Sequence, residues 1–180
     1  MTTYVALLRA VNVGGTGTVP MAVLRNAVAG LGYTRVRSLL QTGNLVFDAN
    51  SNDTMALEAR LAREMERVLG LTTTFFVRDC ATWDVIVAQN PFPQSAADDP
   101  SHLLVMTCPM TPAPAAVEAL RSAIVGREVV AVGDRCLYLV YPDGIGRSKL
   151  TNAMIERKLG LQGTARNWNT VLKIQAMARA

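Results

Sequence analysis

The sequence predicts an α+β protein built from two consecutive β-α-β-β-α-β units, each followed by one added helix. Short apolar runs with strand composition alternate with stretches whose apolar residues recur at helical spacing, in the same order in both halves of the 180-residue chain. The stretch 94–101 is rich in proline and small residues, which favours a linker between predicted domains at 1–93 and 102–180. The halves also share a short similarity, because R-D-C-A-T at 78–82 aligns with R-N-W-N-T at 166–170.

The first half of the chain carries clear start and stop signals. Pro20 and Gly32 are typical of the first turn and the end of a helix. Thr42-Gly43 separates two β-rich runs and predicts a hairpin. Asp53 is the expected N-cap of an amphipathic helix. The expected elements are a strand at 4–9, a helix from Thr18 to 31, strands at 35–40 and 44–48, a helix from Asp53 to 69, a strand at 73–78 and a helix at about 80–89.

The second half repeats this order. Gly133-Asp134 predicts the turn between two strands, and Gly160 is expected to end the helix that follows. Asn167 is expected to cap the final helix, as Asp79 is expected to cap the trailing helix of the first half. The expected elements are a strand at 102–107, a helix at 113–125, strands at 128–132 and 135–141, a helix at 148–159, a strand at 164–167 and a helix at 169–179.

Several predicted strands are apolar on both faces. Val5 and Leu7 alternate with Ala6 and Leu8, and the run 103–106 in the second half is apolar throughout. In a two-layer unit the helices cover only one face of the sheet, so the other face needs a cover. The other unit is the simplest cover, so we expect the two sheets to pack against each other, with a second subunit as the alternative. The chain is therefore expected to be a monomer or a homodimer.

Composition and charge limit the class of protein. No apolar run approaches the roughly 20 residues of a membrane-spanning helix, and no secretory signal is visible, so a globular cytoplasmic protein is expected. Three widely spaced cysteines and a single histidine, His102, match no zinc-binding spacing, so neither a metal nor another cofactor is expected. The net charge is +4, and residues 144–180 hold seven Lys/Arg against one acidic residue, Glu156. This asymmetry favours an anionic partner.

Four blocks of the sequence carry a resemblance to a known family. They are L-L-R-A-V-N-V-G-G at 7–15, Q-T-G-N-L-V-F at 41–47, Y-P-D-G-I-G-R-S-K-L-T at 141–151 and T-A-R-N-W-N-T-V at 164–171. In this order they resemble the bacterial family called domain of unknown function 1697, with Ala10 where glycine is expected. The resemblance spans nearly the whole chain. It implies paired ferredoxin-like units and brings no established activity.

Candidate binding residues in the second half form two clusters. Residues 146–149 lie where a loop is expected to enter a helix, so backbone N–H groups and two cations would suit a phosphate or carboxylate. A glycine turn with Ser148 as an ordinary N-cap explains the same residues. Residues 166–169 combine groups that stack on and bond to a planar, nucleotide-like molecule, and a helix cap with a tryptophan plug is the alternative. The candidates are Gly146, Arg147, Ser148, Lys149, Arg166, Asn167, Trp168 and Asn169.

Candidate binding residues in the first half lie in two loops. The glycine-rich loop after the first strand is a common place for ligand contacts, although glycine there also serves turn geometry. The second loop is most simply explained as the hairpin turn itself. The candidates are Arg9, Asn12, Gly14, Gly15, Gln41 and Asn44.

Three classes of function fit these observations. The first is binding of an anionic ligand, either a phosphorylated small molecule or nucleic acid, through the basic C-terminal unit. RNA-recognition modules share the β-α-β-β-α-β order, but their RNP1 pattern of glycine and aromatic residues is missing. The second is a metal-independent enzyme acting on a phosphorylated or carboxylate substrate, although the spacing reveals no nucleophile beside an activating group. The third is a dimerising interaction module.

Overall fold

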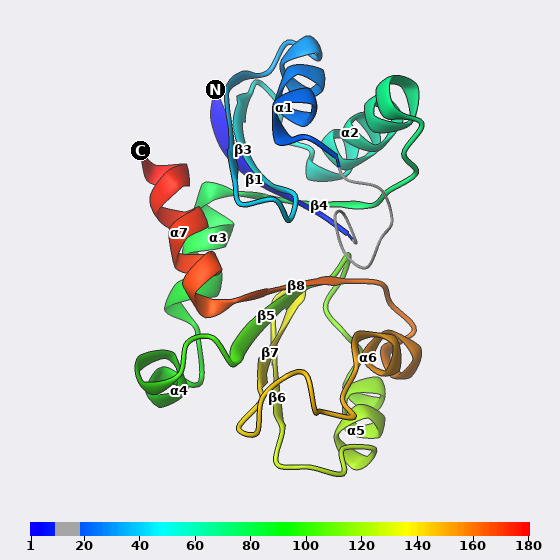
Figure 1. Cartoon of the computed structure of the whole chain (residues 1–180), viewed down its shortest axis with the longest axis vertical. Helices are drawn as coiled ribbons and strands as arrows, with labels where there is room; N and C mark the ends of the chain where they lie inside the picture. The colour runs from blue at the N-terminus through cyan, green and yellow to red at the C-terminus, as the bar shows by residue number, and fades with distance from the viewer. Residues whose placement is uncertain (10–18) are drawn as a thin grey trace. The chain divides into compact units, whose positions relative to one another are not determined.

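The computed structural model of the chain describes residues 1–9 and 19–180 (Figure 1). Within these residues the chain forms eight strands and seven helices, and the strands make two four-stranded antiparallel sheets. The predicted α+β class is confirmed, with two similar halves. None of the helices in the described ranges is long and apolar enough to cross a membrane. The candidates Asn12, Gly14 and Gly15 and the predicted helix start at Thr18 lie outside the described residues.

Contacts within the chain divide it into two units. Both boundaries fall inside helices, α3 (Cys80–Ala88) and α7 (Trp168–Arg179). The stretch 94–101, expected as a linker, includes most of a short helix, α4 (Pro93–Asp98). The units are Met1–Val85 with Lys173–Ala180 for unit 1, and Ile86–Leu172 for unit 2.

Unit 1 contains a sheet with the strand order β2-β3-β1-β4. In Figure 1, helices α1 and α2 lie on one side of this sheet. Buried residues such as Leu24, Phe47 and Leu61 join these helices and strands in one core. Asp53 caps α2 as predicted, because its Oδ1 accepts hydrogen bonds from two backbone N–H groups at 2.9 and 3.0 Å. The elements are β1 (Thr2–Leu8), α1 (Met21–Gly30), β2 (Thr34–Leu39), β3 (Asn44–Ala49), α2 (Thr54–Leu69) and β4 (Phe75–Asp79).

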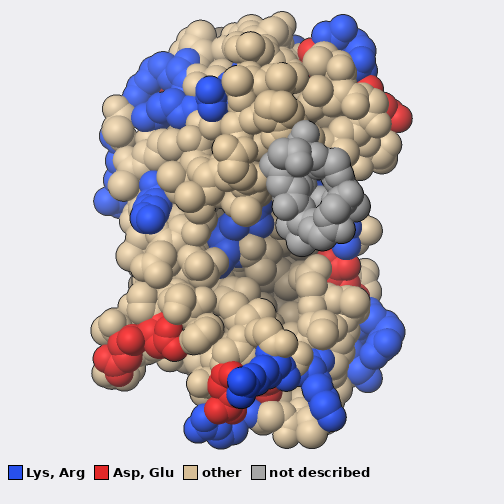
Figure 2. Space-filling model, in the orientation of Figure 1, with Lys and Arg blue, Asp and Glu red and all other residues tan. Residues whose placement is uncertain are grey.

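Unit 2 has the matching strand order β6-β7-β5-β8. Figure 1 shows α5 and α6 on one side of the sheet, and their core includes Leu120, Leu137 and Ile155. Basic and acidic side chains lie close to one another over the lower part of the view in Figure 2, where unit 2 is. The elements are β5 (Leu103–Thr107), α5 (Pro114–Ser122), β6 (Val129–Gly133), β7 (Cys136–Val140), α6 (Asn152–Leu159) and β8 (Thr164–Asn167).

The short similarity between the halves marks equivalent places in the two sheets. Arg78 and Arg166 occupy the same register position on the last strand of their sheets, each opposite a valine of the first strand. Asp79 and Asn167 follow them, and each side chain accepts a hydrogen bond from the backbone N–H of the third residue of the next helix, at 2.6 and 3.0 Å. The two predicted caps are therefore confirmed.

Both faces of the central strands of each sheet are buried, as the doubly apolar strands predict. On the face away from the helical cores, Val5, Leu7 and Val46 of unit 1 are at most 1% exposed, and so are Val105 and Tyr138 of unit 2. The continuous apolar sequence of these strands therefore reflects burial of their side chains on both faces of the sheet. The expected packing of one sheet against the other stays a prediction.

Tyr33 gives a direct test of the unit 1 core. Its ring stacks on Phe47 with centroids 4.8 Å apart, but its hydroxyl is buried and has no hydrogen-bond partner among the described residues. Tyr33→Phe removes the unpaired hydroxyl and should raise the free energy of unfolding by about 1 kcal/mol in urea denaturation. Tyr4→Phe is the matched control, because the Tyr4 hydroxyl donates to Ser51 O, and it should lower this free energy by about 1 kcal/mol. A lower free energy of unfolding in Tyr33→Phe would show that the Tyr33 hydroxyl has a hydrogen-bond partner.

Candidate functional site

Three of the unit 1 candidates are among the described residues: Arg9 follows β1, Gln41 lies in the turn between β2 and β3, and Asn44 begins β3. Asn44 is fully buried, and its Nδ2 donates to Leu39 O and to Thr42 Oγ1, both at 2.9 Å. This amide therefore holds the turn. Arg9 follows β1 and is partly buried, whereas Gln41 is exposed in the turn.

The same turn packs closely against β1. The backbone N–H of Leu8 donates to Gly43 O at 2.9 Å. Gly43 has a φ of +73°, and a Cβ at this position would lie 2.8 Å from Leu8 Cβ. Only glycine meets both conditions, so the T-G pair of this block has a structural reason that needs no ligand.

The two units differ in the connection that leads from the third strand to the second helix. In unit 1 this connection is residues 50–53, and in unit 2 it is residues 141–151. Connections in compact domains commonly have about 4–6 residues, and longer ones often carry function. The unit 2 connection, called the β7–α6 loop below, contains the whole first candidate cluster, Gly146, Arg147, Ser148 and Lys149.

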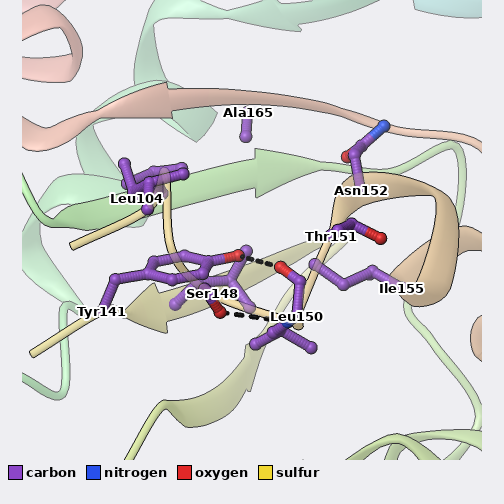
Figure 3. Close-up of a pocket in the computed structure, with 10 residues that line it drawn as sticks. Leu104, Tyr141, Ser148, Leu150, Thr151, Asn152, Ile155 and Ala165 are labelled. Atoms are coloured by element: carbon purple, nitrogen blue, oxygen red, sulfur yellow. Dashed lines mark hydrogen bonds between the residues drawn. The ribbon is translucent and has the colours of Figure 1, made fainter. Parts of the chain in front are cut away.

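Side-chain hydrogen bonds hold the β7–α6 loop in place, and Figure 3 draws two of them. The Tyr141 hydroxyl donates to Leu150 O, and Leu150 N donates to Ser148 Oγ, each at 3.0 Å. The Ser148 hydroxyl donates in turn to Glu128 Oε1. Burial and the nearby Glu128 charge raise the pKa of Tyr141 to about 12, so its hydroxyl remains a donor at neutral pH. The loop is therefore ordered without a ligand.

Helix α6 does not begin at this cluster, and the prediction of a helix from Ser148 is wrong. The N-cap is Thr151, whose Oγ1 accepts a hydrogen bond from Met154 N at 3.2 Å. Ser148 and Thr151 both carry a hydroxyl before the helix, but Ser148 Oγ accepts from Leu150 N, which lies outside the helix, and Thr151 directly precedes its first residue, Asn152. The positive end of the helix lies at Asn152, so it gives no support to an anion at residues 146–149.

One pocket lies beside the two candidate cations and is called the basic pocket. Its volume is about 220 Å³. The side chains of Arg147 and Lys149 have no ion pair within residues 1–9 and 19–180. Asp143 is bonded by Arg127, with Nε to Oδ2 at 3.0 Å, and this contact lowers the pKa of Asp143. The pocket is lined by Val125, Gly126, Glu128, Asp143, Gly144, Arg147, Ser148 and Lys149.

A second pocket shares Ser148 with the basic pocket and is called the apolar pocket (Figure 3). Its volume is about 270 Å³. Leu104 of β5, Leu139 of β7 and Ala165 of β8 bring the sheet to this pocket. The other lining residues are Tyr141, Ile145, Ser148, Leu150, Thr151, Asn152 and Ile155, from the loop and the start of α6.

The second candidate cluster is built into the fold of unit 2. Asn167 caps α7, and Trp168 is only 6% exposed, so its indole offers no open face for stacking. Arg166 is partly buried and donates to a hydroxyl and a carbonyl of the two preceding residues at 2.7 and 2.8 Å. Burial lowers the pKa of Arg166 to about 10. Asn169 is exposed. This geometry matches the alternative of a cap with a tryptophan plug.

Two residues beside the β7–α6 loop, Asp99 and His102, were not predicted from the sequence as candidate site residues. His102 Nδ1 lies 2.6 Å from Asp99 Oδ2, and Ser101 Oγ donates to Asp99 Oδ1 at 2.7 Å. The Ser101 and His102 contacts lower the pKa of Asp99. A Cβ at Gly144 would lie 3.7 Å from His102 Nε2, so the second ring nitrogen faces the loop. The D-P-S-H sequence predicts only a turn, and the single available signal was that His102 is the one histidine of the chain.

Tyr141→Phe tests the hydrogen bonds that hold the loop. The variant leaves the buried Leu150 O without its donor, so the free energy of unfolding at pH 7 should fall by about 1–3 kcal/mol in urea denaturation.

The pH dependence gives the control for Tyr141→Phe. Burial raises the pKa of Tyr141 to about 12, above the roughly 10 of an unfolded tyrosine, so its contribution is complete below about pH 10 and declines as the pH rises toward 12. The variant should therefore lose less stability than the wild type between these pH values. Equal stability of the two proteins at pH 7 would show that the bond contributes nothing.

Comparisons with known proteins place the chain in a family. The solved structure of conserved bacterial protein SP0830 from Streptococcus pneumoniae is similar over 98% of both chains, with 19% sequence identity and a TM-score of 0.73, which shows a shared fold. A putative chlorite dismutase, TA0507, aligns over 97% of this chain and 100% of its own with 15% identity, but its TM-score of 0.24 supports no argument. No curated protein matches the chain. The profile described as "Protein of unknown function (DUF1697)" matches residues 1–138, and the chain therefore belongs to that family.

Proposed function

We propose that unit 2 binds a small anionic molecule, phosphorylated or carboxylate-bearing, in the basic pocket. The observation that carries this proposal is the position of Arg147 and Lys149. They flank Ser148 and line one pocket, and neither side chain has an ion pair in the described part of the chain. A guanidinium and an ammonium group at one pocket suit the oxygens of a phosphate or a carboxylate.

The carboxylates of the pocket set the strength of this binding. Asp143 is paired with Arg127, and Glu128 accepts the Ser148 hydroxyl. With Arg127 included, three cations face two carboxylates, which leaves one net positive charge. We expect modest, salt-sensitive affinity for a small anion. Nucleic acid is the weaker candidate, because a strand needs a basic track along several phosphates.

The finer description of the fold belongs to the same proposal. We propose a ferredoxin-like topology for each unit, supported by the element order β-α-β-β-α-β and by the strand orders β2-β3-β1-β4 and β6-β7-β5-β8. On this scaffold the β7–α6 loop is an extension of a connection that is short in unit 1. The expected cytoplasmic location stays a prediction.

Thermal shift with inorganic phosphate, sugar phosphates and nucleotides tests the anion site. A ligand at about 100 times its dissociation constant adds roughly 2.7 kcal/mol, which for a chain of this size raises the melting temperature by about 5–11 °C. Arg147→Ala with Lys149→Ala should abolish the shift of the best ligand. It should leave the unliganded melting temperature within about 2 °C of the wild type, because neither side chain has an ion pair with another described residue.

A double variant in α6, the helix that follows the loop, provides the matched control. Arg157→Ala with Lys158→Ala removes the same charge from exposed positions in the last turn of α6, outside the lining of the basic pocket. It should retain the shift. An equal loss of the thermal shift in both double variants would show that the shift depends only on the net charge of the protein. A thermal shift that survives Arg147→Ala with Lys149→Ala would overturn the proposal. Salt-dependent binding of short oligonucleotides without binding of small anions would favour nucleic acid.

An enzyme is the second candidate, because Asp99 orients His102 beside the same loop. A carboxylate on Nδ1 leaves Nε2 to accept a proton, which is the arrangement of a general base. If the unit is a hydrolase, the chain should release nitrophenol from p-nitrophenyl phosphate or p-nitrophenyl acetate, and His102→Gln should slow this turnover by about 100-fold or more. His102→Gln should leave the phosphate-induced thermal shift intact. Turnover that persists in His102→Gln would exclude the histidine as the base.

A further inference from the structure

We infer that the ligand of unit 2 carries an apolar group, a single aromatic ring or a short acyl chain, which occupies the apolar pocket while its anionic group contacts the basic pocket. This inference rests on the proposed anion site and adds the class of ligand. It follows from the lining, the size and the position of the apolar pocket.

The lining of the apolar pocket offers apolar contact and little else. Leu104, Leu139 and Ala165 come from the sheet, and Ile155 comes from α6. In Figure 3 the side chains of Leu104 and Ile155 border an open space, with Ala165 on one side and Tyr141 on the opposite side.

The polar side chains at this pocket already have partners within the chain. The Tyr141 hydroxyl is bonded to Leu150 O, and Ser148 is bonded to Glu128 and to Leu150 N. Thr151 caps α6, and Asn152 Nδ2 donates to Glu156 Oε1 at 3.2 Å. A polar group of a ligand therefore gains little here, and an apolar group displaces water without breaking these bonds.

The size of the apolar pocket selects one ring or a short chain. A buried cavity of about 150 Å³ holds benzene, whereas pockets for drug-sized ligands are about 300–1,000 Å³. At about 270 Å³ the apolar pocket accommodates a substituted ring or a chain of a few carbons. A volume of this size fits a small molecule, which we take as the occupant.

The position of the pocket supplies the charge that this ligand requires. Ser148 lines both pockets, and Arg147 and Lys149 are its neighbours in the chain and line the basic pocket. An apolar molecule without an anionic group would leave the two cations unpaired, and an anion without an apolar group would leave the apolar pocket to water. A compound that combines both groups uses both pockets, and the bonds that order the loop reduce the entropy lost on binding.

Titration calorimetry of the full chain with three probes tests the inference. The probes are inorganic phosphate, phenyl phosphate and benzyl alcohol. Phenyl phosphate should bind at least about tenfold more tightly than inorganic phosphate, because the ring enters the apolar pocket. Ala165→Leu fills the pocket and should remove this advantage while leaving the affinity for inorganic phosphate unchanged.

Ala116→Leu is the matched control. Ala116 and Ala165 are both partly buried against the same core, but Ala116 does not line the apolar pocket. Ala116→Leu should keep the preference for phenyl phosphate. Ala165→Val adds less volume and serves if Ala165→Leu lowers the melting temperature strongly, because overpacking strains a core. It should reduce the preference in part.

The outcomes separate this inference from the proposed function. Equal affinity of phenyl phosphate and inorganic phosphate in the wild type, or an equal loss in Ala165→Leu and Ala116→Leu, overturns the inference and leaves the anion site intact. Binding of phenyl phosphate and benzyl alcohol that Ala165→Leu abolishes, with no effect of Arg147→Ala and Lys149→Ala, supports the apolar pocket and overturns the anion site. No binding of phenyl phosphate at about 1 mM overturns both.

Discussion

The packing of each sheet on two helices is the constraint on which the rest of this structure depends. In unit 2 it joins Leu139 of the sheet and Ile155 of α6 in one core, and the chain must then cross from the end of β7 to the start of α6 without opening that core. Tyr141 and Leu150 are the core residues at the two ends of this crossing, and the hydrogen bond between them closes it. The crossing is longer than the packing requires, and both pockets lie beside the extra residues.

The two units meet the same constraint with the same devices. Glu58 and Glu156 each lie five residues after the N-cap of their helix, and their carboxylates accept hydrogen bonds from Val77 N and Gly163 N, at 2.8 and 3.1 Å, at or just before the last strand. These contacts pair backbone groups at a sheet edge that has no neighbouring strand. The units diverge in the connection after the third strand. In unit 2 this connection carries Arg147 and Lys149, which line the basic pocket.

The candidate site could be predicted from the sequence in part. The basic C-terminal segment led to the prediction of Arg147 and Lys149, which line the basic pocket, but a count of charges overstates how many cations a ligand can reach. Arg166 bonds groups of its own strand, and Arg179 pairs with Asp84 at 2.9 Å. The apolar pocket could not be predicted, because its walls come from three strands and a helix that are distant in sequence. The sequence shows which residues are charged. Whether a charged side chain can contact a ligand depends on the residues that folding brings next to it.

The sequence by itself determined the order of strands and helices, the two-sided burial of the strands and the caps at Asp53, Asp79 and Asn167. These features depend on residues within a few positions of one another, so local patterns are sufficient to predict them. Only the tertiary structure decided that Thr151 and not Ser148 caps α6, and that Ser148 donates to Glu128, which lies 20 residues earlier in the chain. The tertiary structure also decided that His102 faces the β7–α6 loop. Contacts between segments that are distant in the chain produce no periodic pattern in the sequence, so they could not be predicted from it.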